Sequence, residues 1–378
     1  MPTILVSMVA RDTIAPIQAL RAVAALIVCV AHAYGQIHWL PSELSFGVVG
    51  VDIFFVISGF IIVYSSETLF ERPNGPETFF IRRLIRIVPL YWLCCTILIA
   101  WVVANGGLGA KHWPLSAVIA NYFFIPVNYP DAAGIRGDPF YGIGWTLLYE
   151  MLFYFAFGIA MWTRSRQASI AVAALVLVSL ILIGLTFDLP QPLRYWSKPI
   201  TLEFIYGMLI ATAFRSDIRF TAPVGVLIAA LGLTLLILFK LGTGLASPPM
   251  RGILSGIPAA LIVASAALTP LHKTDGRGWK FALFWGGASY SLYLVHPLAF
   301  LIPKHDFGGR FGQLSVTHPY LGLAMLISGA LVIAALTHLF FEKPITAVLR
   351  NRASSIVSLI TSLRTHGSAS KSEAIYKT

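Results

Sequence analysis

An arginine and a histidine stand eleven residues apart at the ends of an otherwise apolar run, LRAVAALIVCVAH, from Leu20 to His32. At about 100° per residue, a helix places Arg21 and His32 on one face, roughly 16 Å apart along its axis. If this helix crosses a bilayer, Arg21 lies near the headgroups and His32 close to the hydrocarbon midplane, where ionisable side chains mark functional sites. A histidine there has the chemistry of a general base.

Three further apolar runs each carry an ionisable side chain: Asp52 in GVDIFFVISGFII, Glu150 in YGIGWTLLYEMLF and His296 in SYSLYLVHP. A carboxylate beside a histidine fixes the tautomer of the ring and stabilises the imidazolium that forms when a hydroxyl proton is taken. We expect Asp52, on the neighbouring span, or Glu150 to orient His32 in this way. His296 is either a satisfied polar group in a helix kinked by Pro297 or a functional residue.

Three arginines, Arg82, Arg83 and Arg86, stand at the start of the apolar run FFIRRLIRIVPLYW. Guanidinium groups form paired hydrogen bonds with phosphate oxygens, so this cluster is suited to a phosphorylated donor. Coenzyme A has phosphates at one end and a thin arm of roughly 15–20 Å, which is comparable to the Arg21–His32 spacing. A topology anchor whose side chains extend to the lipid headgroups is the alternative reading.

Ser58 and Gly59 form a small notch in the second apolar run. Such a notch admits either a slender ligand or the backbone of another helix, and for the glycine alone helix packing is favoured. On the fourth run, Thr146, Glu150 and Tyr154 follow at four-residue spacing and so share a face.

These runs must be held by membrane-spanning elements, because hydrophobic residues make up 57% of the 378 residues and charged residues only 11%. We predict an all-α integral membrane protein of about ten transmembrane helices. The predicted spans are 17–37, 46–66, 84–104, 141–162, 168–187, 199–214, 221–241, 252–269, 283–303 and 319–341. The span 199–214 is short and contains Glu203, and a nine-span count would move the C-terminus to the other side.

The basic residues set the orientation. With a cytoplasmic N-terminus, 19 of the 27 lysines and arginines fall on the cytoplasmic side, as the positive-inside rule expects for ten spans with both termini inside. The net charge of +11 is then explained by topology and anionic lipid, without nucleic acid. A cleavable signal peptide is the disfavoured alternative for the first span. The three cysteines lie in apolar spans and have neither zinc-site nor disulfide spacing, so we predict no metal.

Five motifs together resemble the membrane-bound acyltransferase 3 family, which comprises bacterial exopolysaccharide and O-antigen O-acetyltransferases. They are the Arg21–His32 pair, GVDIFFVISGFII at 50–62, FFIRRLIRIVPLYW at 79–92, GWTLLYE at 144–150 and SYSLYLVHP at 289–297. The resemblance covers 17–345, which we take as the acyltransferase domain, between a cytoplasmic lead at 1–16 and a basic cytoplasmic tail at 346–378. The chain looks like the stand-alone form, without an appended hydrolase-like domain.

The resemblance implies an enzyme of the bacterial inner membrane that transfers an acyl group, with acetyl favoured. The donor is cytoplasmic acyl-CoA as co-substrate, and the acceptor is a hydroxyl of a saccharide or lipid-linked saccharide. No bound cofactor is implied. The catalytic candidates are His32 as general base with Glu150 or Asp52 as its orienting group. The candidates for binding acyl-CoA are Arg21, Arg82, Arg83, Arg86, Ser58 and Gly59. Supporting candidates are Trp145, Tyr149, Tyr293 and His296.

Direct transfer is preferred to an acyl-enzyme on Ser58, because nothing adjacent in the sequence shows an activating base. A transporter or flippase is the rival class, although no inverted repeat is found. The sequence identifies neither the acceptor nor the oligomeric state.

Overall fold

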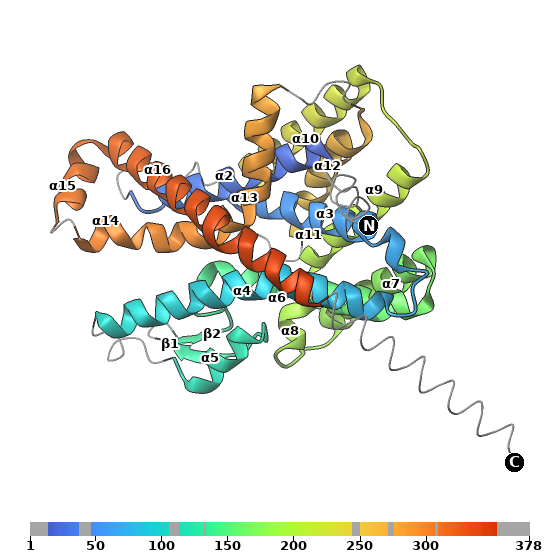
Figure 1. Cartoon of the computed structure of the whole chain (residues 1–378), viewed down its shortest axis with the longest axis horizontal. Coiled ribbons are helices and arrows are strands. Elements are labelled where there is room, and N and C mark those ends of the chain that lie inside the picture. Colours follow the sequence, from blue (N-terminus) through green and yellow to red (C-terminus); the bar gives the residue numbers. More distant parts are fainter. Residues whose placement is uncertain are drawn as a thin grey trace, which may run out of the picture.

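The computed structural model describes residues 14–37, 47–105, 113–131, 134–243, 250–270, 276–306 and 309–353. Within these ranges the regular secondary structure is helical apart from one short antiparallel hairpin (Figure 1). In the hairpin, β1 (Tyr129–Asp131) pairs with β2 (Gly134–Arg136), and Tyr129 lies opposite Arg136. The prediction of an all-α membrane bundle is therefore confirmed, with this hairpin as an addition.

Each predicted span contains a helix. In order they are α2 (Ala15–Tyr34), α3 (Gly47–Ser65), α4 (Gly75–Ala104), α6 (Trp145–Ala160), α7 (Arg166–Thr186), α9 (Leu202–Arg215), α10 (Ala222–Thr243), α11 (Arg251–Leu254) with α12 (Gly256–Leu268), α13 (Arg277–Ala299) and α16 (Pro319–Thr337). Seven helices in the described ranges are long and apolar enough to cross a membrane, which makes the chain a multi-pass membrane protein. The helices α3, α9 and α13 are not among those seven, so the ten-span count stays a prediction.

Shorter elements connect these helices. They are η2 (Glu67–Leu69), α5 (Leu115–Tyr122), η4 (Gly142–Gly144), η5 (Met161–Thr163), α8 (Leu193–Trp196), η6 (Pro199–Thr201), α14 (Leu301–Asp306), α15 (Arg310–Thr317) and the π-helical turn η7 (His338–Glu342). A further helical stretch, 343–353, continues from η7. Most of the predicted lead at 1–16 and tail at 346–378 lies outside the described residues.

Close backbone approaches fix the directions of the central helices. A Cβ on Gly50 of α3 would lie 2.5 Å from the Ala24 carbonyl of α2, and one on Gly47 would meet Ala31, so α2 and α3 are antiparallel neighbours. By contrast, α13 runs in the same direction as α2. Gly286 packs against Gln18 near the start of α2, while His296 contacts His32 near its end.

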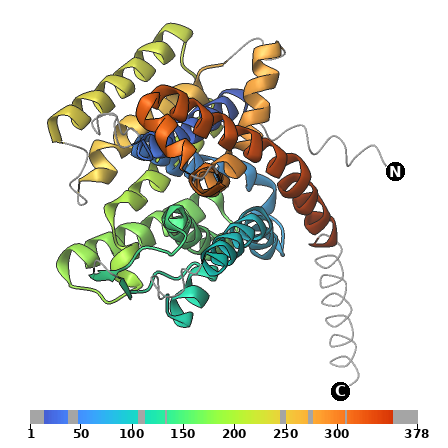
Figure 2. The ribbon, with the colours of Figure 1, turned by 90° about the vertical axis from the view of Figure 1, so that its left-hand side faces the viewer.

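The helices α2, α3 and α13 lie in the middle of the molecule. In both views α4, α6 and α7 lie on one side of them, and α10 and α12 lie on the other (Figures 1 and 2). The residues Ala24, Ala25, Val28 and Cys29 of α2 are completely buried in this centre. The bundle therefore holds the Arg21–His32 helix at its core.

Candidate active site

The two histidines singled out in the sequence meet in the structure. His32 lies in the last turn of α2 and His296 in the last turn of α13. The Nδ1 of His32 is 3.0 Å from the Nε2 of His296, and the rings stack with their centroids 5.0 Å apart. The Nδ1 of His296 is in turn 2.9 Å from the carbonyl oxygen of Leu292. His296, placed among the supporting residues, is thus the partner of His32.

These contacts assign the tautomers of the neutral pair. The Leu292 carbonyl only accepts hydrogen bonds, so the Nδ1 of His296 carries the proton and its Nε2 is an acceptor. The Nδ1–H of His32 therefore donates to the Nε2 of His296. The Nε2 of His32 is left as an unprotonated base.

The two rings differ in exposure. His296 is completely buried, whereas the side chain of His32 is exposed. A substrate hydroxyl can therefore reach His32 while His296 stays enclosed. His32 lies close to the end of α2, which ends at Tyr34 with Gly35 as its cap, and its midplane location stays a prediction. The predicted span extended to residue 37.

Asp52 has a different partner from the predicted one. Its Oδ1 accepts hydrogen bonds from the Nε (3.1 Å) and Nη2 (2.8 Å) of Arg251, and the carboxyl group is completely buried. Glu203, also completely buried, is its other electrostatic neighbour. The expectation that Asp52 orients His32 is therefore corrected. Arg251 was missed because it lies in the loop-like stretch SPPMRGILSG, whose local pattern gives no signal for a buried ion pair.

Glu150 accepts hydrogen bonds from two hydroxyl groups and does not orient His32 as predicted. The Ser58 hydroxyl donates to its Oε1 at 3.0 Å, and the Tyr154 hydroxyl donates to the same oxygen. The predicted shared face of Glu150 and Tyr154 is thus used. This carboxylate beside Ser58 has the chemistry of a base, which the sequence did not show, so the geometry permits an acyl-enzyme as well as direct transfer.

Three of the four candidate arginines gather near Glu150. Arg21 donates to Gln18 Oε1 at 3.1 Å and interacts electrostatically with Arg86 and Glu150. Arg83 donates to the Ser65 hydroxyl, and its guanidinium lies 5.4 Å from the Phe79 ring centroid. All three arginines are partly buried, whereas Arg82 is exposed. Partly buried guanidinium groups at the start of α4 are a suitable site for phosphate.

The face of α2 between Arg21 and His32 is closed. Ala25, Val28 and Cys29 lie on that face and are completely buried. A ligand that spans the two ends must therefore run beside this face.

Gly59 belongs to a helix contact. A Cβ on Gly59 would lie 2.1 Å from the Phe204 carbonyl oxygen, and one on Gly207 would lie 2.0 Å from the Val56 carbonyl oxygen. The backbones of α3 and α9 therefore touch at these two glycines. Gly59 thus packs against another helix, as the alternative reading predicted, and its assignment to acyl-CoA binding stays a prediction.

The aromatic candidates lie in two places. Tyr293 bonds the Thr146 hydroxyl at 2.7 Å, and its ring lies edge-on to His296 with centroids 6.4 Å apart. Trp145 lies under the Arg251 guanidinium at 5.2 Å, and Tyr149 stacks on Tyr195 at 4.8 Å. Tyr293 thus supports the histidine pair, and Trp145 belongs to the Asp52–Arg251 cluster.

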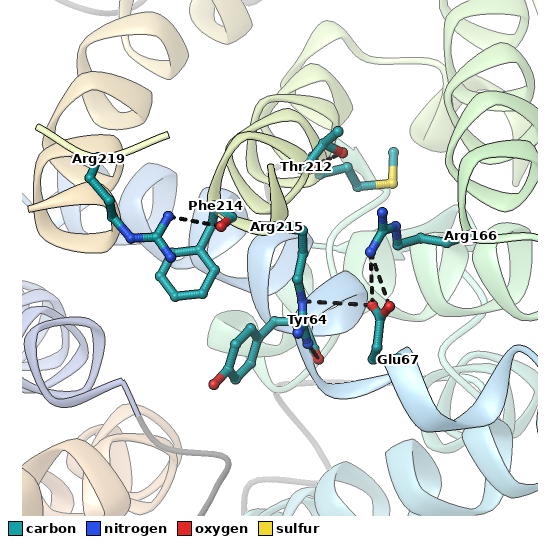
Figure 3. Close-up of polar contacts among 8 residues, drawn as sticks. Tyr64, Glu67, Arg166, Thr212, Phe214, Arg215 and Arg219 are labelled. Atoms are coloured by element: carbon teal, nitrogen blue, oxygen red, sulfur yellow. Dashed lines mark hydrogen bonds and ion pairs between the residues drawn. The ribbon is translucent and has the colours of Figure 1, made fainter. Parts of the chain in front are cut away.

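A second ionic cluster ties the loops at the arginine end of the bundle (Figure 3). Glu67 accepts hydrogen bonds from Arg166 at 3.0 and 3.2 Å and lies 3.6 Å from Arg215. Arg215 also donates to the Tyr64 carbonyl at 2.9 Å. The cluster joins the end of α3 to the start of α7 and the end of α9.

A family model described as acyltransferase domain matches residues 14–339, nearly the whole chain. The chain belongs to this acyltransferase 3 family. The resemblance drawn from the five motifs is thereby confirmed, and the chain is an acyltransferase, not a transporter. Within the described ranges, this chain has no group of three or more His, Cys, Asp or Glu side chains that could hold a metal ion.

Relatives within the family have named roles. The exopolysaccharide production protein ExoZ of Rhizobium meliloti is 30% identical over 320 residues, which cover 84% of this chain and 94% of that protein. The acyltransferase MdmB of Streptomyces mycarofaciens is 27% identical over 88% of this chain and 92% of its own. The O-acetyl transferase of Shigella phage Sf6 is 31% identical over 52% of this chain and 62% of its own. No solved structure matches the chain.

Proposed function

We propose that this acyltransferase moves an acetyl group from cytoplasmic acyl-CoA to a hydroxyl of a cell-surface or exported saccharide, the acceptor being free or lipid-linked. The observation that carries the proposal is the His32–His296 pair, which leaves an exposed, unprotonated nitrogen on the same helix as Arg21. The names of ExoZ and of the Sf6 O-acetyl transferase support a saccharide acceptor and acetyl transfer.

In the proposed reaction the Nε2 of His32 takes the proton of the acceptor hydroxyl as its oxygen attacks the thioester carbonyl. The new C–O bond forms, the C–S bond breaks, and the imidazolium returns the proton to the sulfur of CoA. His296 acts as a positioning residue, because its Nε2 accepts the Nδ1–H of His32 and so holds the ring and stabilises its charged form.

At the other end, Arg21, Arg83 and Arg86 would hold the donor phosphates. We place this end at the cytoplasmic face, with both termini cytoplasmic in the bacterial inner membrane, as the distribution of basic residues favours. Because the direct face of α2 is filled, the thin arm of the donor is expected to run beside Glu150 and Ser58.

The parallel course of α2 and α13 supports the ten-span topology. Two spans run in the same direction when an odd number of other spans lies between them. Spans one and nine satisfy this only when α9 is counted, whereas a nine-span count makes α2 and α13 antiparallel. The close approach of α3 and α9, at Gly59 and Gly207, agrees with α9 lying across the bundle.

The test is release of CoA from acetyl-CoA by the protein in lipid nanodiscs, with surface polysaccharide of the source cell as acceptor. Wild type should release CoA and deposit acetyl ester, whereas His32→Ala should do neither and still fold. His318→Ala, at an exposed histidine that precedes α16, is the matched control and should keep full activity. An active His32→Ala variant would overturn the role of His32. If the wild-type protein never releases CoA, the proposal that acetyl-CoA is the acyl donor would be overturned.

A further inference from the structure

A buried glutamate lies at the π-helical turn that ends α16. The turn η7 contains five residues, His338–Glu342, and Glu342 is only 7% exposed. Wide turns of this kind are rare and are often found at functional sites. The reaction proposed above does not use Glu342.

Glu342 is fixed by two hydrogen bonds to one of its oxygens. The Ser291 hydroxyl of α13 donates to Oε2 at 2.7 Å, and the Nδ1 of His338 lies 2.8 Å from the same atom. Neither bond occupies Oε1. The carboxylate is therefore held in one orientation with an oxygen left for another partner.

The neighbours of Glu342 place it at the arginine cluster. Tyr290, adjacent to Ser291, donates its hydroxyl to the Ile87 carbonyl at 2.7 Å, and Ile87 directly follows Arg86 on α4. Electrostatic interaction links Glu342 to Arg86 and to Arg21. One stretch of α13 thus brings the end of α16 against α4 beside the predicted phosphate site.

Charge explains why a carboxylate is needed there. Arg21 and Arg86 repel each other across a partly buried space, where charge interactions are several-fold stronger than in water. Glu150 acts on Arg21 from α6 but is already engaged by two hydroxyls. A second carboxylate, bonded so that it cannot turn away, keeps both guanidinium groups inside the bundle before any phosphate arrives.

We propose that Glu342 is a positioning residue for the donor, which holds Arg21 and Arg86 where the phosphates of acyl-CoA bind. The inference rests on the acyl-CoA donor of the proposed function. It adds a residue from the last described helix to a site otherwise built from the first, third and fourth spans. The competing explanation is that Glu342 only ties α16 to α13 through Ser291.

A donor without phosphates separates the two explanations. Glu342→Gln keeps the shape of the side chain and an acceptor oxygen but removes the charge. With acetyl-CoA we expect this variant to raise KM about tenfold, with kcat within about threefold and the acceptor KM unchanged. With S-acetyl-pantetheine, which has no phosphates, kcat/KM of the variant should equal that of wild type.

The matched control is Glu67→Gln, which also removes a carboxylate shared by two arginines at the same end of the bundle. It should leave the acetyl-CoA KM unchanged. Ser291→Ala, which frees the Glu342 carboxylate, should raise the acetyl-CoA KM in the same donor-dependent way but less.

The outcomes are distinct. Equal defects with both donors, or no defect in Glu342→Gln and Ser291→Ala, would overturn the role of Glu342 and leave the proposed function standing. If wild type turns over neither donor, the proposed function fails, and this inference fails with it.

Discussion

The imidazoles of His32 and His296 meet at 3.0 Å although 264 residues separate them in the chain. Each ring lies in the last turn of its helix, and the two helices run in the same direction. The carbonyl of Leu292 completes the relay by fixing the proton on the Nδ1 of His296. The two rings differ in their surroundings: His296 is completely buried, whereas His32 is exposed.

His296→Phe should lower kcat about 100-fold, a typical loss for a group that orients a general base, with little change in the acyl-CoA KM. His296→Gln should recover part of the loss, because its side-chain oxygen can accept the Nδ1–H of His32. CoA release with saturating acceptor measures both. Full activity in His296→Phe would show that the contact is only packing.

Ser58→Ala should retain activity within about tenfold, because in direct transfer the Ser58 hydroxyl only donates to Glu150. Wild type mixed with acetyl-CoA in the absence of acceptor should show no burst of CoA. Intact-mass measurement should likewise show no added acetyl group. A burst that Ser58→Ala abolishes, with acetyl on the Ser58 peptide, would establish the acyl-enzyme route with Glu150 as base.

Asp52→Asn should destabilise the protein by about 3–5 kcal/mol, the usual result of leaving a buried charge without its partner. The carboxylate is completely buried, and the side chain of Arg251 is only 19% exposed. The double variant Asp52→Asn/Arg251→Met should recover most of this loss, since it removes both charges. Thermal unfolding in a single detergent measures the shift, and a double variant no better than the single one would contradict the ion-pair explanation.

Gly59→Ala should destabilise the protein by about 1–3 kcal/mol through overpacking, because the new methyl group would meet the Phe204 carbonyl. Gly329→Ala inside α16, where a Cβ has nothing within 4 Å, is the control and should not unfold below the wild-type temperature. If Gly59→Ala instead keeps its stability and only raises the acyl-CoA KM, the glycine contacts the donor after all.

Local patterns in the sequence predicted much of this molecule. The apolar runs predicted ten spans, and each predicted span contains a helix. The shared face of Glu150 and Tyr154 follows from helical spacing alone. These features depend on neighbours within a few residues or on short connections, and there the pattern is informative.

The partners of the charged groups were not predictable in the same way. Asp52 faces Arg251, and His32 faces His296, through contacts between helices far apart in the chain. A single sequence shows which ionisable groups are buried and therefore need partners, but several candidates satisfied that requirement equally. The packing of α13 along α2, and of α11 near α3, determines which of these candidates become partners.

The two histidines of the pair are also synthesised at different times. At roughly 5–20 residues per second, the ribosome makes His296 roughly 13–50 seconds after His32. During that interval the first helix is already in the membrane with its base unpartnered, and the enclosing contact with α13 has yet to form. With the roles proposed above for the two histidines, packing of α13 against α2 is the step that makes the nascent chain active, and chains stalled before it should accumulate in the membrane without activity.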